Sequence, residues 1–479
     1  MKKKVYKTLG FYIGIVSSIA CCYLLYCLFQ WNAIPVVWVG LILFLLIGLG
    51  FYLLLRHRVI GTILFVLLIG ISSFGSYYIH QVNVAIEKVT VPAMSEAKFM
   101  MVSLNDQDCF ERLGVASIGN VELQELALSK LSDTYDCVYF DSFLDLGEAL
   151  MNRSVDAICV SDISYELLLE MESISKDFTK IVKEWIVEVD STVSSIPVDV
   201  IQDPFTVYIS GRDLVDYSTA FSHSDVNILM TINPTTHQIL MLGIPRDTYI
   251  PQTKANNQKD KLTHTGLYGA NCIVDSVSNF FEVPINYYVE VNFNSLIHVV
   301  DALDGVVVDS PFAFSTSKFD FVQGENQLNG ESTLAFCRER YSFEDGDKER
   351  SRNQMRVLKA IINKAMSPAI IQNYSELMES LSDSFTSNMT QKEMTSFLSS
   401  QLKNLKDWDI QQIQIGGNGI MTVSPALGFE VYMMDPDMNT VESATSLMEK
   451  MLNGEKLSSK DIENHNEKVI SNQEWMANV

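Results

Sequence analysis

Three apolar runs without a charged residue, all within the first 80 residues, constrain the fold most. They span Leu9–Phe29, Ile34–Leu55 and Val59–Tyr78. Each has about 20 residues, the length that an α-helix needs to cross the hydrocarbon core of a bilayer. A cleaved signal peptide could also begin with the basic segment Met1–Lys4, but the first run is too long for one and two more runs follow it. The sequence therefore predicts three transmembrane helices in residues 1–80.

The charges around these runs predict an orientation. Four lysines precede the first run, and Arg56–Arg58 separates the second run from the third, whereas the first linker, Gln30–Ala33, is uncharged. Because positive residues favour the cytoplasmic side, the N-terminus and the 56–58 loop are expected in the cytoplasm. The protein is then a multi-pass cell-membrane protein with residues from about 80 onward outside the cytoplasm.

Charge is divided unevenly along the chain. The 479 residues carry a net charge of −23, yet residues 1–90 contain seven basic residues and one acid, Glu87. That segment is therefore at +6 and the rest of the chain at −29. Nucleic-acid backbones are bound by clustered Lys and Arg, so an acidic body that lies mostly outside the cytoplasm argues against a nucleic-acid partner.

The extracytoplasmic part is predicted to form a stalk and two α/β domains. Residues 81–97 form the expected stalk, and residues 98–200 form a small accessory domain without a chemical motif, in which strand-like and helical stretches alternate. These stretches are Cys137–Phe140 and Ala157–Val160 for strands, and Glu122–Leu131 and Tyr165–Met171 for helices.

Residues 201–454 are predicted to form a larger α/β domain, followed by a polar tail, 455–479, that is expected to be disordered. β-rich runs alternate there with amphipathic helical stretches, which is typical of a mixed sheet covered by helices. The runs are Phe205–Ile209, Val226–Ile232, Gln238–Ile244 and Tyr287–Phe293, and the helical stretches are Asn271–Phe281, Ser295–Leu303, Glu349–Met366 and periodic segments within 371–410.

Carboxylates stand at the ends of three of these predicted strands. They lie in Ser210–Asp213, Ser222–Asn227 and Ile244–Asp247. Adjacent strands would bring Asp213 and Asp225 together, and carboxylate oxygens are ligands that suit Mg²⁺ or Mn²⁺. Ordinary turn and cap residues would also explain any one of the three stretches.

The densest cluster of basic residues outside the membrane follows at Arg338, Arg340, Arg350, Arg352 and Arg356. If 338–340 ends a strand, its two arginines point to the same face. Arg350 and Gln354 share one face of the predicted helix, and arginine suits bidentate contact with phosphate oxygens. The alternative is a network of salt bridges with nearby acids, which we expect for Arg352 and Arg356; these acids are Asp345, Asp347 and Glu349.

Residues 204–366 strongly resemble the LytR-CpsA-Psr family. The resemblance rests on motifs in the family's order, with Lys259–His264 and Ile285–Tyr288 fitting as well; the motifs are Gly211–Asp213, His223–Asp225, Pro245–Asp247, Arg338–Tyr341, Asp345–Asp347 and the pair Arg350 and Gln354. Three spans and an additional domain resemble the CpsA (Wzg) branch, which accompanies capsule genes of Gram-positive bacteria.

The resemblance implies an α/β/α domain with phosphotransferase activity. Such an enzyme moves a glycopolymer, here a capsular polysaccharide, from undecaprenyl-pyrophosphate to peptidoglycan with Mg²⁺ (or Mn²⁺). Other membrane proteins of capsule assembly are further expected partners. By the same resemblance, Asp213 and Asp225 hold the metal and Arg246 and Asp247 are catalytic. The residues expected to bind the pyrophosphate are His223, Arg246, Arg338, Arg340, Arg350 and Gln354.

One position departs from the family's pattern. The family has Arg where this chain has His223. An imidazole with an ordinary pKa of about 6.5 is only partly charged at neutral pH. We therefore expect weaker binding of pyrophosphate or a sharper pH dependence of activity.

Two other functions fit the same sequence features. The protein could be a membrane regulator or scaffold of capsule assembly that acts through partners, since little of it is expected in the cytoplasm. It could also hydrolyse the polyprenyl pyrophosphate, with water in place of the sugar acceptor at the same site.

Overall fold

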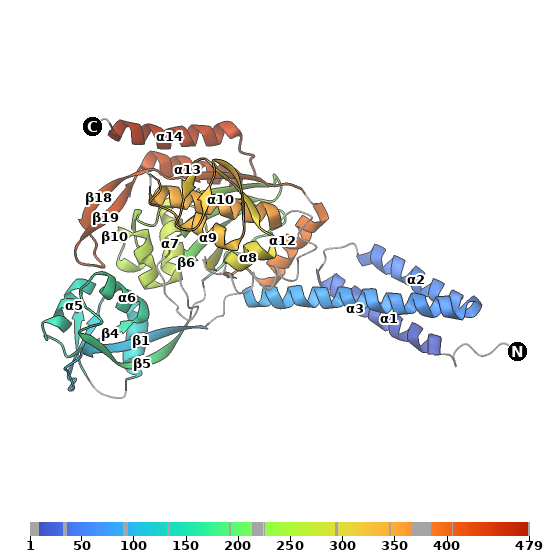
Figure 1. The fold of residues 1–479 in the computed structure, drawn as a ribbon, viewed down its shortest axis with the longest axis horizontal. Coiled ribbons are helices and arrows are strands. Elements are labelled where there is room, and N and C mark those ends of the chain that lie inside the picture. Colours follow the sequence, from blue (N-terminus) through green and yellow to red (C-terminus); the bar gives the residue numbers. More distant parts are fainter. Residues whose placement is uncertain are drawn as a thin grey trace.

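The computed structural model describes most of the chain. The described residues are 9–31, 36–89, 94–131, 135–190, 193–212, 224, 226–292, 296–343, 346–365, 385–404 and 406–477. Within them lie an N-terminal helical bundle, an accessory domain and a large domain (Figure 1).

The bundle consists of α1 (Leu9–Trp31), α2 (Val36–Arg56) and α3 (Arg58–Val89). Three segments are long and apolar enough to cross a membrane, as predicted: Leu9–Phe29, Val36–Arg56 and Arg58–Gln81. The helices pack through a small core around Phe65 and Leu54, while most of their other large apolar side chains are exposed. This distribution suits helices whose outer faces contact lipid.

α3 continues past its apolar part toward the rest of the molecule (Figure 1). The N-terminal half of the expected stalk, up to Val89, is therefore helical, and β1 begins at Met94. Close to the end of α3, Gln391 Nε2 of the large domain donates a hydrogen bond to Asn83 O at 3.4 Å.

The accessory domain is a five-stranded sheet in the order β3-β2-β4-β1-β5. Strands β2, β3 and β4 are parallel, and β1 is antiparallel to both β4 and β5. Asn120, Ser142 and Ser161 cap the helices, since each side chain accepts a bond from a first-turn amide. The elements are β1 (Met94–Leu104), β2 (Arg112–Ala116), α4 (Val121–Ser129), β3 (Asp136–Phe140), α5 (Phe143–Met151), β4 (Ala157–Ser161), α6 (Asp162–Glu170) and β5 (Thr179–Asp190).

The large domain has a six-stranded mixed sheet in the order β16-β11-β6-β7-β8-β17. β11 runs parallel to β6 and β17 parallel to β8, whereas β7 is antiparallel to both its neighbours. The predicted mixed sheet is therefore confirmed. Its strands are β6 (Phe205–Arg212), β7 (Val226–Asn233), β8 (Gln238–Gly243), β11 (Tyr287–Asn292), β16 (Phe385–Ser387) and β17 (Asp409–Gln414).

Helices cover both faces of this sheet, because alternate residues of its central strands are apolar on both sides. Leu229 and Leu240 pack with α7 (Ala270–Phe281) and α13 (Met438–Leu452). Ile228 and Met241 pack on the other side with α10 (Asp347–Ala365) and α12 (Gln391–Asn404). Every residue of β7 and β8 is buried as a result.

Smaller elements surround the sheet. A separate core, with Phe314, Phe336 and Val357 among its members, joins α8, α9 and the short strands β12 to β15 to α10. The bounds of the smaller elements are β9 (Tyr249–Pro251), η2 (Thr253–Ala255), β10 (Lys259–Lys261), η3 (Leu262–Tyr268), α8 (Leu296–Ala302), β12 (Val306–Ser310), β13 (Phe314–Ser315), β14 (Asp320–Phe321), β15 (Gly324–Leu328), α9 (Gly330–Arg338), β18 (Gly417–Val423) and β19 (Glu430–Pro436).

The expectation of a disordered tail is wrong for its described part. Residues Ser459–Ala477 form α14, which packs on α13 and β17. Ile462 and Val469 are buried there, and the fully buried His465 has its Nε2 at 3.1 Å from Gln414 O. Ile462, His465 and Val469 lie on one face of this otherwise polar helix and pack it against the domain.

Candidate functional site

The candidate site lies where several strands of the large sheet end, and we call this side of the sheet its edge. The carboxyl ends of β6, β8, β11 and β17 lie at this edge, together with the amino end of β7. In open α/β sheets, ligands bind outside such carboxyl ends. The loop after β8, which carries the predicted Arg246 and Asp247, begins here.

A tight turn presents Arg246 and Asp247. Thr248 N donates to Pro245 O at 3.0 Å, which closes the turn. Two further amides hold its carbonyl groups, with Thr263 N at 3.0 Å from Arg246 O and Met434 N at 2.8 Å from Asp247 O. The two side chains are 30% and 16% exposed, so they are partly shielded from water but remain accessible.

Asp247 lies between two cationic side chains. Its Oδ1 accepts a bond from Lys261 Nζ at 2.9 Å, and its Oδ2 lies 3.9 Å from Arg246 Nε. Lys261 is only 17% exposed. The carboxyl group of Asp247 thus links Arg246 and Lys261 across the turn. Lys261 lies in a sequence motif that suggests no role for it, and the pairing of β9 with β10 brings it close to the turn.

The N-terminal half of α10 packs directly against the end of β8. Gly243 allows this approach, because a Cβ there would lie 2.8 Å from Met355 Cε and 3.3 Å from Ser351 Oγ. Arg350 and Gln354 belong to the same helical turns. Gln354 is 6% exposed, and its Oε1 has no hydrogen-bond partner among the described residues. A buried acceptor in that state is costly and suits a site that receives a donor from a ligand.

Arg352 and Arg356 of the arginine cluster form ion pairs with one buried acid. Glu349, 3% exposed, accepts bonds from Arg352 Nη1 at 2.7 Å and Arg356 Nη1 at 2.6 Å. The predicted salt-bridge network is thus confirmed for these two residues through Glu349. Asp345 lies outside the described residues.

The interpretation of Arg338–Arg340 as a strand end is wrong. Arg338 is the exposed last residue of α9, and Arg340 follows it in the connection to α10. The guanidinium of Arg340 lies 4.7 Å from the ring centroid of the exposed Tyr341 and also donates to its hydroxyl at 2.5 Å. Phe336 and Cys337 anchor this end of α9 against α10. The helix formed because Asn329 and Ser332 make a capping box before an apolar stretch.

The expected metal ligands Asp213 and Asp225, and also His223, lie outside the described residues. The strands that flank them are described, and Gly211 of β6 pairs with Val226 of β7 at the same sheet edge. Among the residues that the structure describes, no group of three or more His, Cys, Asp or Glu side chains could hold a metal ion.

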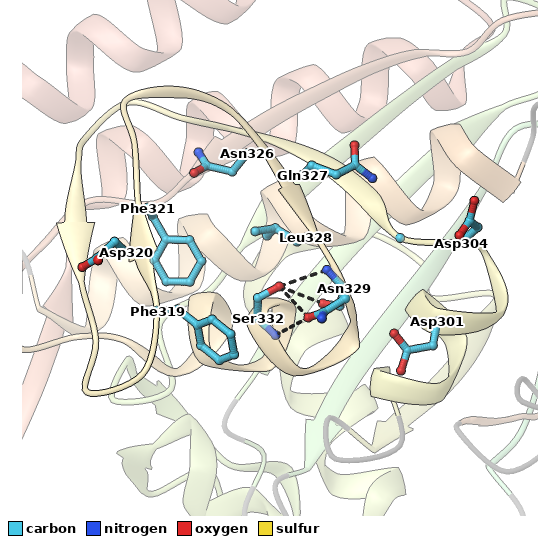
Figure 2. Close-up of a pocket in the computed structure, with 11 residues that line it drawn as sticks. Asp301, Asp304, Phe319, Asp320, Phe321, Asn326, Gln327, Leu328, Asn329 and Ser332 are labelled. Carbon is cyan, nitrogen blue, oxygen red and sulfur yellow. Dashed lines mark hydrogen bonds between the residues drawn. The ribbon is translucent and has the colours of Figure 1, made fainter.

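A second concave region lies at the other end of α9 (Figure 2). It has a volume of about 480 Å³ and is lined mainly by carboxylates, carboxamides and two phenyl rings. The side chain of Asn329 caps the helix beneath it, and Asp301 Oδ1 accepts a bond from Gly330 N at 2.7 Å. The acidic lining distinguishes this pocket from the arginine-bearing end of α9. Its residues come from separate segments that share no sequence motif.

Comparison with known proteins decides the family. The model of the LytR_cpsA_psr family matches residues 171–448, more than half of the chain. The protein belongs to this family. The position of the LytR_cpsA_psr region shows that the large domain is its family domain, and the resemblance inferred from the motifs is confirmed.

Relatives within the family carry a common name. The chain is 36% identical over 211 residues to the polyisoprenyl-teichoic acid–peptidoglycan teichoic acid transferase TagU of Bacillus subtilis (strain 168), and 35% identical over 210 residues to TagU of Bacillus licheniformis. Each match covers 44% of this chain and 64% or 63% of the relative, which is less than two thirds of its length.

Solved structures also match part of this chain. The crystal structure of B. subtilis TagV matches with 26% identity and a TM-score of 0.45, over 53% of this chain and 98% of TagV. That of B. subtilis TagU matches with 32% identity and a TM-score of 0.42, over 54% of this chain and all of TagU.

Proposed function

We propose that the protein is a membrane-anchored extracytoplasmic phosphotransferase that moves a glycopolymer from undecaprenyl-pyrophosphate to peptidoglycan. We take the glycopolymer to be a capsular polysaccharide, on the resemblance to the CpsA branch. The observation that carries the proposal is the cationic edge of the family domain. There the turn with Arg246 and Asp247 meets Lys261, and the α10 turns with Arg350 and Gln354 pack against the end of β8.

The cationic edge fits the chemistry of such a transfer. A hydroxyl oxygen of the acceptor attacks the phosphorus that bears the polymer, and the bond from this phosphorus to the bridging oxygen breaks. Undecaprenyl phosphate leaves with the electron pair, and the hydroxyl proton passes to a base, for which Asp247 is our candidate. Arg246, Arg338, Arg340 and Arg350 would neutralise the charge that grows on the phosphate oxygens. The Oε1 of Gln354, which has no hydrogen-bond partner in the described part of the chain, would accept a bond from the substrate.

We assign Asp213 and Asp225 as the residues that would hold Mg²⁺ or Mn²⁺, since carboxylate oxygens suit these ions. A bound divalent ion would supply further neutralisation of pyrophosphate charge. His223 would contact the same pyrophosphate more strongly when protonated. The charge pattern around the three apolar segments supports an N-terminus in the cytoplasm and an extracytoplasmic body, which can meet a lipid-linked donor at the membrane.

A transfer assay with the full chain in lipid nanodiscs tests the proposal. The donor is a polyprenyl-pyrophosphate-linked glycan, the acceptor is peptidoglycan, and Mg²⁺ is present. Arg246→Ala should lower the rate at least about 100-fold, because it removes a cation that stabilises developing charge. Arg153→Ala is the matched control, because this exposed arginine pairs with Asp106 in the accessory domain, and it should leave the rate unchanged.

Other outcomes separate the competing functions. Release of free polymer phosphate without attachment to peptidoglycan would favour hydrolysis of the carrier. Full attachment by Arg246→Ala, together with altered capsule quantity in cells, would favour a regulator or scaffold.

A further inference from the structure

The β18–β19 hairpin of the large domain reaches from the sheet to the accessory domain (Figure 1). At its tip, Ala426 O and Leu427 O accept bonds from Phe143 N and Leu144 N, both at 3.1 Å. These are the first amides of α5, which have no acceptor within their own helix. Ala426 and Leu427 are also members of the buried core of the accessory domain. The tip is therefore bound to the accessory domain by both hydrogen bonds and apolar packing.

The other end of the same hairpin holds the turn of the candidate site. Met434 of β19 donates its amide to Asp247 O at 2.8 Å and forms a parallel bridge with Thr248. Only three residues separate Met434 from the start of β19 at the hairpin tip. One short, regular strand thus connects the contact with α5 to the turn that carries Arg246.

A buried carboxylate lies between these two ends. Asp260 accepts bonds from Ser424 Oγ at 2.8 Å and Ala426 N at 3.2 Å, both in the tip loop, and its Oδ1 lies 2.9 Å from His264 Nδ1. Burial by itself would raise the pKa of Asp260, but the bonds from His264, Ser424 and the Lys261 amide outweigh it and the pKa lies below its ordinary value.

The neighbour of Asp260 completes the connection. Lys261 follows it in β10 and reaches Asp247 with its Nζ at 2.9 Å. The next two amides along the chain, of Leu262 and Thr263, donate to Thr248 O and Arg246 O. The segment anchored by Asp260 therefore holds the turn through three independent contacts.

We propose that docking of the accessory domain on the tip of the β18–β19 hairpin holds the Arg246–Asp247 turn in its geometry, with Asp260 as the positioning residue. Asp260 acts through Lys261 and the hairpin and touches no substrate. The accessory domain, which has no recognised chemical motif, thereby becomes part of what shapes the site. The effect of docking on the geometry of the turn does not depend on the proposed function, and only its effect on the rate of transfer rests on that function.

Hydrogen–deuterium exchange of the full chain in nanodiscs tests the inference without an activity assay. Leu144→Pro removes the amide that donates to Leu427 O, and a proline is tolerated in the first turn of a helix. Leu144→Ala is the matched control, because it shortens the same side chain and keeps the amide. Peptide 244–250 should exchange about fivefold faster in Leu144→Pro than in Leu144→Ala, the effect of one lost hydrogen bond.

A second variant changes the large-domain side of the same contact. Ser424→Ala removes the hydroxyl that donates to Asp260 and should also accelerate exchange of peptide 244–250, whereas Ser446→Ala, an exposed position on α13, should not. Peptides from β4 and β7 must exchange as in the wild type, which excludes general unfolding of either domain. Unchanged exchange of 244–250 in both Leu144→Pro and Ser424→Ala would overturn the inference.

Kinetics then separate the inference from the proposed function. If the wild type transfers polymer, kcat should fall in both variants in the order of their exchange rates. A wild type without transfer activity would contradict the proposed function, while the exchange result would still decide whether the accessory domain holds the turn.

Discussion

The two α/β domains of this protein differ in what lies at the carboxyl ends of their parallel strands. In the accessory domain, the loops after β2 and β4 form a crevice of only about 20 Å³ around Gly119 and Ser161, and Leu267 of the large domain lies against it. In the large domain, the corresponding edge carries Arg246, Asp247 and Lys261, all partly accessible.

A point where strand order reverses is a common ligand site in α/β sheets. Here one such edge is covered by the protein's own chain, and the other is left with charged groups. Sheet topology therefore creates the same kind of strand end in both domains, whereas the residues that follow the strands decide whether it becomes a contact between domains or a candidate binding site.

Substitution of Glu349 should give the largest difference in stability between the two domains. Glu349→Ala leaves Arg352 and Arg356 without their buried partner, and breaking such a pair typically costs about 3–5 kcal/mol. Exchange of β7 amides should therefore become much faster while β4 amides change little. The control is Glu331→Ala, which removes an ion pair exposed on both sides and should cost less than about 1 kcal/mol. Equal destabilisation by both variants would contradict the structural role of Glu349.

Substitution of Gly119 should weaken the contact between the domains. Gly119 has φ +87°, and a Cβ there would lie 3.0 Å from Leu267 O. Gly119→Ala should therefore cost about 1–3 kcal/mol, part of it from backbone strain. Gly454→Ala isolates the strain, because φ is +82° and no atom lies within 4 Å of the added Cβ. Thermal unfolding of both variants measures the difference, and equal melting temperatures would mean that the contact with Leu267 contributes nothing.

Gln354 should matter for activity and little for stability. Gln354→Met keeps the side-chain size and removes the buried acceptor that has no partner among the described residues, so the unfolding free energy should change by less than about 1 kcal/mol. Transfer should fall about tenfold because one substrate hydrogen bond is lost. Gln401→Met should instead lower stability and leave transfer unchanged. Gln401 is similarly buried but bonds to Lys406 O and Trp408 Nε1. A destabilised but fully active Gln354→Met would reverse our assignment.

The smallest expected effect concerns α14. Burial lowers the pKa of His465 below its ordinary value of 6.5. The docked helix therefore favours the neutral imidazole, and its stability is complete above pH 6.5 and declines as the pH falls below it. Limited proteolysis within 459–469 should be faster at pH 5.5 than at pH 7.5, and His465→Gln should reduce that difference. An unchanged pH dependence in the variant would show that other groups control docking.

Much of the fold could be predicted because its signals are local. The three apolar runs, the strands around 205–244 and the amphipathic α10 each follow from a repeating pattern within one segment. α14 was missed because its few buried residues, such as Ile462 and Val469, lie among polar ones. Arg338 was misplaced because a capping box at Asn329, and not β propensity, decides the preceding segment.

The candidate site was predicted in its residue types and only partly in its contacts. Arg246, Asp247, Arg350 and Gln354 lie where adjacent elements of one sheet edge should place them. The pairing of Asp247 with Lys261 depends on the register of β9 and β10, and the bond from Met434 comes from a strand almost 190 residues later. Contacts of that range are decided by packing of the whole domain, which no local pattern contains.

α3 has a consequence for the distance between the large domain and the apolar segments. Its apolar part ends at Gln81 and the same helix continues to Val89, which adds eight residues or roughly 12 Å of rigid rise. The bond between Gln391 and Asn83 fastens the large domain to that rod. The large domain therefore contacts α3 beyond the segment that is apolar enough to cross a membrane. If the large domain transfers a lipid-linked polymer as proposed, this offset restricts the reaction to donors whose reactive group extends a similar distance from the membrane.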